Sequence, residues 1–113
     1  MSDAPIDLAH LGRYTAGDAR LERELLDLFV RTAGDCLARL DAAPDARAWA
    51  EAAHGLRGAA LGIGAARMAV LVARAEACGP GAAGREVLPA LAAALAEVQA
   101  FAAGRPRREQ SCR

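Results

Sequence analysis

His54, Arg57 and Gly58 are the residues of this sequence whose types and spacing could do chemistry. A neutral imidazole is a good nucleophile near neutral pH. An arginine three residues further along a helix lies one turn away on the same face, where its guanidinium can bind phosphate oxygens. A glycine four residues further removes side-chain bulk beside the imidazole. Because phosphoryl transfer needs mainly positioning and charge stabilisation, this trio predicts a histidine that accepts a phosphoryl group.

The segment that carries the histidine is rich in glycine. The stretch Gly55–Gly64 holds four of the eleven glycines of a chain that contains 31 alanines. Each glycine inside a helix costs about 1 kcal/mol relative to alanine, so these glycines indicate that something approaches the helix closely. Gly64 is expected to end or bend the helix. Gly55 and Gly62 receive no role from the sequence.

The composition and the hydrophobic periodicity predict an all-α protein. Only nine residues are β-branched, and apolar residues recur at helical spacing. We expect five helices, the first four over about 7–13, 18–41, 46–63 and 65–78, and the fifth over about 85–103. Asp7 and Asp45 are candidate N-caps. Short connections between long helices favour an up-and-down antiparallel four-helix bundle with a short extra N-terminal helix. The bundle should occupy residues 1–103, and residues 104–113 should form a basic, disordered tail.

The helical wheel of the segment 46–63 separates a core face from an outer face. The core face carries apolar residues at a and d spacing, namely Trp49, Ala53, Leu56, Ala60 and Ile63. His54 lies about 100° around the helix from Ala53. Its own face carries Arg47, Ala50, Glu51, Arg57, Gly58 and Leu61, which predicts that the imidazole is exposed. On the preceding helix the apolar face is expected to carry Leu21, Leu25, Leu28, Phe29, Cys36 and Leu40.

Charge and cysteine content argue against several classes of protein. Fourteen arginines balance fourteen acidic residues, and lysine is absent. The basic charge gathers in the tail and leaves a mildly acidic body, which does not predict a nucleic-acid partner. Cys36, Cys78 and Cys112 are odd in number and far apart, so neither disulfides nor a zinc site is expected. No apolar run approaches the length of a membrane span, and we expect a cytoplasmic protein.

The run His54-Gly55-Leu56-Arg57-Gly58-Ala59-Ala60, followed by Gly64-Ala65, resembles the signature of the histidine-containing phosphotransfer (HPt) domain. The resemblance covers about residues 6–103. It implies a helical bundle in which His54 is phosphorylated on Nε2 by the aspartyl phosphate of a receiver domain. It also implies that Arg57 stands where lysine is commoner and holds the phosphoryl group, and that Gly58 keeps the imidazole accessible.

The resemblance further implies a phosphocarrier in a multistep two-component phosphorelay. Its partners would be response-regulator receiver domains and/or a hybrid sensor histidine kinase. The sequence has no kinase or ATP-binding motif, so no cofactor or metal is expected on this chain, and the Mg²⁺ of the reaction should belong to the receiver. A single active histidine is compatible with a monomer.

The receiver is expected to dock on the exposed face around His54, with candidate contacts Arg47, Glu51, Leu61 and Arg67. Glu51 could either serve only as a solvated residue or orient the imidazole. The alternative function is a non-catalytic bundle that binds a receiver or a kinase without carrying phosphate. His10 has no comparable neighbours and is expected at the surface or at its boundary.

Overall fold

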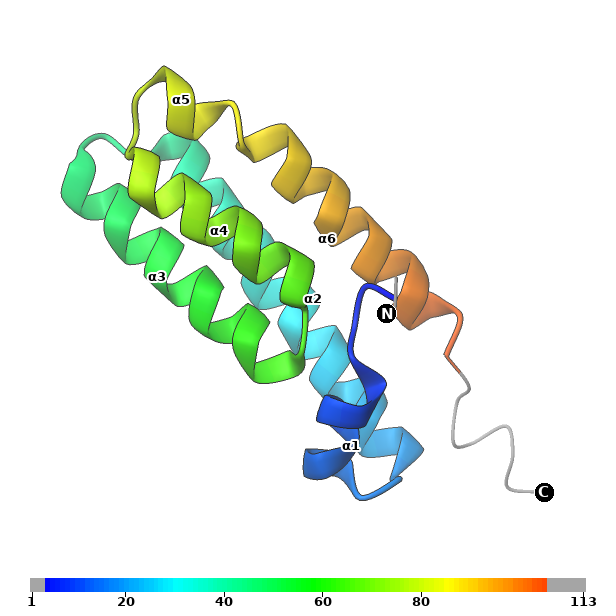
Figure 1. Ribbon diagram of the computed structural model, residues 1–113. Coiled ribbons are helices and arrows are strands. Elements are labelled where there is room, and N and C mark those ends of the chain that lie inside the picture. The colour runs from blue at the N-terminus through cyan, green and yellow to red at the C-terminus, as the bar shows by residue number, and fades with distance from the viewer. Residues whose placement is uncertain (1–3, 106–113) are drawn as a thin grey trace.

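The computed structural model describes residues 4–105, and the regular secondary structure of this part of the chain is entirely helical (Figure 1). The prediction of an all-α protein is confirmed. The helices are α1 (Leu8–Thr15), α2 (Ala19–Ala42), α3 (Ala46–Ile63), α4 (Ala66–Cys78), α5 (Ala82–Arg85) and α6 (Leu88–Ala103).

Aspartate side chains begin the first three helices. Asp7 and Asp18 each accept hydrogen bonds from two backbone amides of the first turn, and Asp45 accepts one from the amide of Ala48 at 2.9 Å. Such caps satisfy amides that have no partner inside the helix. Asp45 and Gly64 bound α3 at the residues that the sequence predicts.

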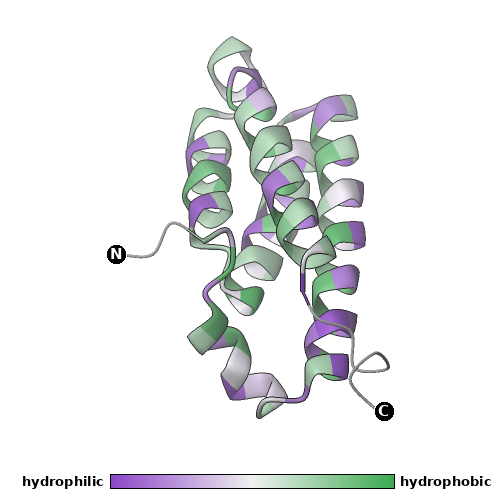
Figure 2. Cartoon of the chain, turned by 90° about the vertical axis from the view of Figure 1, so that its right-hand side faces the viewer, coloured by the Kyte–Doolittle hydropathy of each residue, from purple (hydrophilic) through white to green (hydrophobic). Residues whose placement is uncertain are grey.

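The four long helices form a closed ring of contacts. α2 packs against α3 and α6, and α4 packs against the same two helices from the other side (Figure 1). α1 contacts the beginning of α2, where it extends the bundle at one end. Figure 2 shows that the helices carry both hydrophobic and hydrophilic residues, as expected for helices with one buried face.

The core is shared by α2, α3, α4 and α6, and α3 contributes its whole predicted core face to it. All five residues of its predicted core face are buried, and Trp49 is the largest fully buried side chain of the described chain. The indole N–H of Trp49 donates to the carbonyl of Ala75 in α4 at 2.9 Å, so this polar atom is satisfied inside the core. Buried alanines, among them Ala33, Ala53 and Ala60, allow the helices to approach one another closely.

The apolar face of α2 differs from its prediction. The residues that α2 buries are Leu26, Phe29, Ala33, Cys36 and Leu40, which recur at steps of three and four. Leu28, predicted in the core, is 52% exposed, and Leu21 and Leu25 are half-buried. The reason is that α2 carries two apolar stripes side by side, and the prediction merged them into one.

The fifth predicted helix is also different, because it divides into two. The single turn α5 is followed by a turn at Glu86 and Val87, and α6 begins only at Leu88, with Pro89 in its first turn. Proline is tolerated in the first turn of a helix but disrupts a helix interior. Pro89 therefore marks where the last helix can begin.

Arg85 closes the end of the bundle at α5. Its guanidinium group donates to the carbonyls of Pro80, Asp41 and Ala43 at 2.9, 3.0 and 3.3 Å. It also lies over the ring of Trp49, 5.5 Å from the ring centroid. One side chain thereby connects the end of α2 with the loop before α5 and with the core.

One stretch of the described chain, Ala82–Ala103, is long and apolar enough to cross a membrane by length and composition alone. This finding corrects the expectation that no apolar run approaches the length of a membrane span. A single such stretch is a weak indication, because the core helices of water-soluble proteins have the same character. In this fold α6 packs against α2 and α4.

Hydrogen bonds from two arginines connect the end of α6 with the beginning of α2. Arg23 donates to the carbonyl of Ala102, and Arg105 forms two bonds with the Glu22 carboxylate, at 2.6 and 3.1 Å. The rest of the predicted tail, residues 106–113, lies outside the described residues. The domain boundary at residue 103 stays a prediction.

Gly84 should be intolerant of substitution. A Cβ built on Gly84 would lie 1.7 Å from the carbonyl oxygen of Gly79 and 2.9 Å from Trp49. We expect Gly84→Ala to lower the free energy of unfolding by about 3 kcal/mol, because the loop and the indole must both move. Gly81→Ala is the matched control in the same loop, since its Cβ would meet nothing within 4 Å. Denaturant unfolding of both variants tests this, and equal stability would contradict it.

Candidate functional site

His54 projects from the middle of α3 into solvent. The side chain is exposed, as the sequence predicts, and among the described residues none forms a hydrogen bond or an ion pair with its imidazole. The exposed face around it carries every residue that the helical wheel assigned to it, namely Arg47, Ala50, Glu51, Arg57, Gly58 and Leu61. The imidazole nitrogens are therefore open to a reacting group that arrives from outside.

Arg57 places a permanent positive charge one turn from His54. Its side chain is 49% exposed, and its Nη1 lies 3.8 Å from Oε1 of Glu76 in α4. This contact crosses from α3 to α4 and was not predicted from the sequence. The spacing of residues within one helix could not reveal it, because the contact depends on how α4 is rotated against α3.

The glycines near His54 have different surroundings. A Cβ on Gly58 or on Gly62 would meet nothing within 4 Å, so both positions open onto space. A Cβ on Gly55 would lie 3.7 Å from the sulfur of Cys36, which is an ordinary contact. Packing thus requires glycine at none of these three positions, although alanine would be the better helix former.

Gly64 has a structural reason to be glycine. Its φ of 86° lies in the left-handed region, and a Cβ would approach Asp7 and the His10 ring at 3.2–3.3 Å. The amide of Asp7 bonds the carbonyl of Gly64 at 2.9 Å, and Nε2 of His10 lies 3.1 Å from the carbonyl oxygen of Gly62. These bonds hold the start of α1 against the end of α3, and they give the half-buried His10 a structural role.

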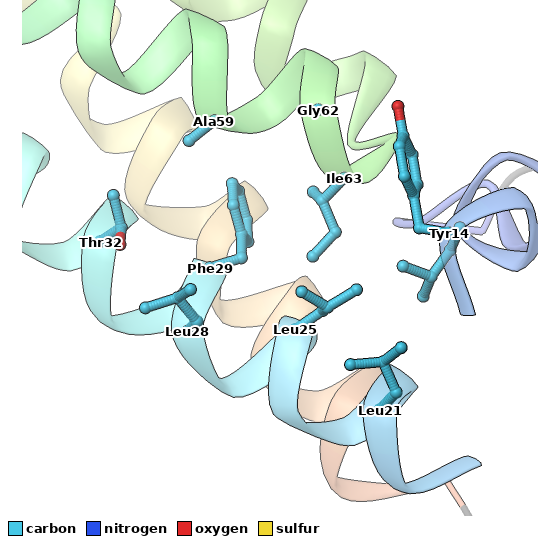
Figure 3. Close-up of a pocket in the computed structure, with 10 residues that line it drawn as sticks. Tyr14, Leu21, Leu25, Leu28, Phe29, Thr32, Ala59, Gly62 and Ile63 are labelled. Carbon is cyan, nitrogen blue, oxygen red and sulfur yellow. The ribbon is translucent and has the colours of Figure 1, made fainter. Parts of the chain in front are cut away.

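An apolar groove lies beside the His54 face, and the expected helix faces did not predict it. Its volume is about 510 Å³. It lies between α1, α2 and the end of α3, and its lining is Leu11, Tyr14, Leu21, Leu25, Leu28, Phe29, Thr32, Ala59, Gly62 and Ile63. Figure 3 shows Leu21, Leu25 and Leu28 of α2 along one wall, with Ala59, Gly62 and Ile63 of α3 opposite.

The groove is continuous with the His54 face through α3. Gly62 lies one turn beyond Gly58, and Leu61, next to Gly62, is 53% exposed. Tyr14 at one end of the groove is 59% exposed. The signal that could have revealed this surface is the second apolar stripe of α2, in which Leu21, Leu25 and Leu28 follow steps of four and three.

The remaining predicted contact residues lie on the surface in ion pairs. Arg47 and Glu51 pair with each other at 3.3 Å, one turn apart on the His54 face. The Glu51 carboxylate is therefore bound to Arg47 and forms no bond with the imidazole. Arg67 of α4 pairs with Glu97 of α6 at 3.2 Å. The structure brings Arg47, Glu51 and Leu61 onto the His54 face, and it places Arg67 at the contact of α4 with α6.

Clusters of metal-binding side chains and a buried cysteine are the other features that could carry chemistry. Within residues 4–105, no group of three or more histidine, cysteine or acidic residues is placed to hold a metal ion. Burial raises the pKa of the Cys36 thiol above its ordinary value, and Asp35 adds to this while Arg39 opposes it. A thiol with a raised pKa is a poor nucleophile, so Cys36 serves the packing of α2 against α3.

Comparison with known proteins gives one family. The family model of the Hpt domain matches residues 24–103, which is most of the chain and includes His54, Arg57 and Gly58. The match begins within α2, so it is shorter than the resemblance drawn from the sequence. No curated protein and no solved structure matches the chain significantly.

Alanine at Gly58 should stabilise the protein, whereas alanine at Gly64 should destabilise it. Gly58 is an exposed helix position with open space at its Cβ, so we expect Gly58→Ala to raise the free energy of unfolding by about 0.5–1 kcal/mol. Gly64→Ala should lower it by about 1–2 kcal/mol or more, because of the left-handed backbone and the contact with Asp7. Denaturant titration measures both changes. A loss of stability in Gly58→Ala would show that this glycine serves packing.

Proposed function

This chain belongs to the Hpt domain family, and we propose that it carries a phosphoryl group between the aspartates of response-regulator receiver domains through His54. Membership in this family supports a role in histidine phosphotransfer within two-component signalling. The observation that carries the specific proposal is the exposed, unpaired imidazole of His54 with the Arg57 guanidinium one turn away. The relay would be multistep, with phosphate arriving from one receiver, or from a hybrid sensor kinase, and leaving to another.

The transfer is a displacement at phosphorus. The lone pair of Nε2 of His54 attacks the phosphorus atom of a receiver aspartyl phosphate. The P–N bond forms while the bond from phosphorus to the aspartate oxygen breaks, and the carboxylate leaves with the electron pair. The imidazole keeps its proton on Nδ1, and that proton can be exchanged with water. The reverse steps return the phosphoryl group to a second receiver.

Arg57 and Gly58 serve this reaction in different ways. The planar guanidinium of Arg57 can donate to phosphoryl oxygens and offset the negative charge on the transferring group. Gly58 leaves the adjacent turn free of side-chain atoms, so that the phosphoryl group and a loop of the receiver can reach the ring. The Mg²⁺ that such a transfer uses would be held by the receiver, where it neutralises the phosphate oxygens.

The apolar groove is the proposed docking surface for the receiver. A receiver that delivers an aspartyl phosphate to His54 must also cover the adjacent surface of α3, and the groove is the continuous apolar surface there. We propose that an apolar helix face of the receiver fills it, with Leu61, Arg47 and Glu51 at the rim. Arg67 stays a prediction as a contact residue.

The scaffold in this proposal is the up-and-down antiparallel four-helix bundle with α1 as its short N-terminal addition. In such a bundle the exposed face of α3 is rigid, because its opposite face is fixed in the core. A single active histidine, His54, would let the protein act as a monomer. A cytoplasmic location would give it access to receivers, and both statements belong to the proposal.

Phosphorylation of His54 is the direct test. Incubation with receiver domains that carry aspartyl phosphate should label the wild type with an acid-labile, base-stable phosphoramidate. His54→Gln should remain unlabelled, while His10→Gln, the matched control at the other histidine, should retain labelling. Phosphate transfer is followed with radiolabelled phosphate, and the bond is identified by its pH stability.

Two results would decide against the relay. Equal labelling of His54→Gln would place the phosphate elsewhere. Receiver binding without any transfer, unchanged in His54→Ala, would instead identify a non-catalytic interaction protein that modulates its partner.

If the receiver docks on the groove, a charged side chain introduced into the groove wall should lower the affinity for the receiver. Burial of a leucine side chain contributes about 1.5–3 kcal/mol, so we expect Leu28→Asp to raise the half-saturating receiver concentration about tenfold or more. The transfer rate at saturation should change little. Val70→Asp is the matched control, since Val70 is 63% exposed on α4 and does not line the groove. Quenched phosphotransfer assays over a range of receiver concentrations measure the half-saturating concentration and the transfer rate at saturation. Equal effects of the two variants would contradict docking on the groove.

A further inference from the structure

The ion pair of Arg57 with Glu76 brings a carboxylate to the edge of the phosphotransfer site. Arg57 reaches from α3 and Glu76 from the last turns of α4, and their nearest charged atoms are 3.8 Å apart. Arg57 is the proposed partner of the phosphoryl group, so Glu76 pairs with the same guanidinium group before the phosphoryl group arrives. The other acidic residue on the His54 face, Glu51, is bound to Arg47.

The geometry of this pair makes it easy to open. The contact is long for an ion pair, and the two side chains are 49% and 31% exposed. Partly exposed pairs of this kind contribute little to stability, so Arg57 can leave Glu76 without disturbing the fold. A phosphoryl group on His54 would carry a charge of about −2, compared with −1 for the carboxylate, and would offer three acceptor oxygens.

Glu76 and a phosphoryl group on His54 would therefore compete for one guanidinium. When Arg57 turns to the phosphoryl group, the Glu76 carboxylate loses its cation and remains near the added negative charge. Both effects raise the free energy of the phosphorylated state relative to the unphosphorylated one. They favour return of the phosphoryl group to a receiver aspartate.

We propose that Glu76 is a positioning residue that holds Arg57 in the unphosphorylated protein and, by competing for it, shifts the transfer equilibrium from His54 toward the receiver. This inference rests on the proposed function, since it concerns the phosphate on His54. It assigns Glu76 a role in how long the phosphate stays on this protein. A carrier that releases its phosphate readily suits a relay.

The test measures the equilibrium ratio of phosphorylated His54 to phosphorylated receiver. Glu76→Gln keeps the size and the hydrogen-bonding ability of the side chain and removes its charge. We expect the ratio to rise about three- to tenfold, and onward transfer to a receiver to slow. Asp27→Asn is the matched control, because it removes one carboxylate from the Arg23–Asp27 surface pair on the side of α2 that faces α6. It should leave the ratio unchanged.

A double-mutant cycle separates positioning from simple repulsion. If Glu76 acts mainly through Arg57, Glu76→Gln should change the ratio much less in an Arg57→Gln background, where only the direct repulsion between Glu76 and the phosphoryl group is left. An effect of full size in that background would overturn the proposal, as would an unchanged ratio in Glu76→Gln alone. Helical circular dichroism and denaturant midpoints of all variants confirm that they are folded.

The outcomes also separate this inference from the proposed function. If the wild type accepts no phosphate on His54, the phosphotransfer function itself fails. If the wild type is labelled and Glu76→Gln has the same equilibrium as the wild type, only the role of Glu76 fails.

Discussion

The apolar face of α3 is buried against its neighbouring helices, and this packing fixes the direction of every side chain on the opposite face. Trp49 anchors the beginning of α3 through its bond to the carbonyl of Ala75, and Ile63 is buried at the end of the helix. A rotation of α3 that buried His54 would expose this row of core residues. Because burial of apolar surface is the main favourable term in folding, the exposure of the imidazole follows from the core.

The glycines of this chain differ in whether backbone conformation or packing requires them. Gly64 and Gly84 are required by the backbone, one by its left-handed conformation and the other by its contact with Gly79 and Trp49. Gly58 and Gly62 have no such requirement, since a Cβ would meet nothing at either position. Both open positions lie on the side of α3 where the imidazole and the apolar groove meet the solvent. The absence of side chains there gives a partner protein closer access to α3.

Local signals explain why some features were predictable from the sequence. The bounds of α3 were predicted because Asp45 and Gly64 act on their own immediate backbone, and the exposure of His54 followed from the period of the helix. The groove was not predicted, because adjacent stripes on α2 look like one broad apolar face until α1 and α3 are in place. The Arg57–Glu76 contact depends on the rotation of α4 against α3, about which the spacing within either helix says nothing.

The site combines a rigid part with parts that can rearrange. The position of His54 is set by the core, whereas Arg57 is held only by a long, partly exposed ion pair. A receiver that fills the groove would bring its aspartate to a fixed imidazole, and the phosphoryl group would then draw the guanidinium of Arg57 from Glu76. Docking is expected to precede the movement of Arg57, because a helix face packed in the core is hard to displace whereas a surface ion pair opens easily. In the proposed relay, packing would thus determine where the phosphate binds, and a weak electrostatic contact would determine how firmly it is kept.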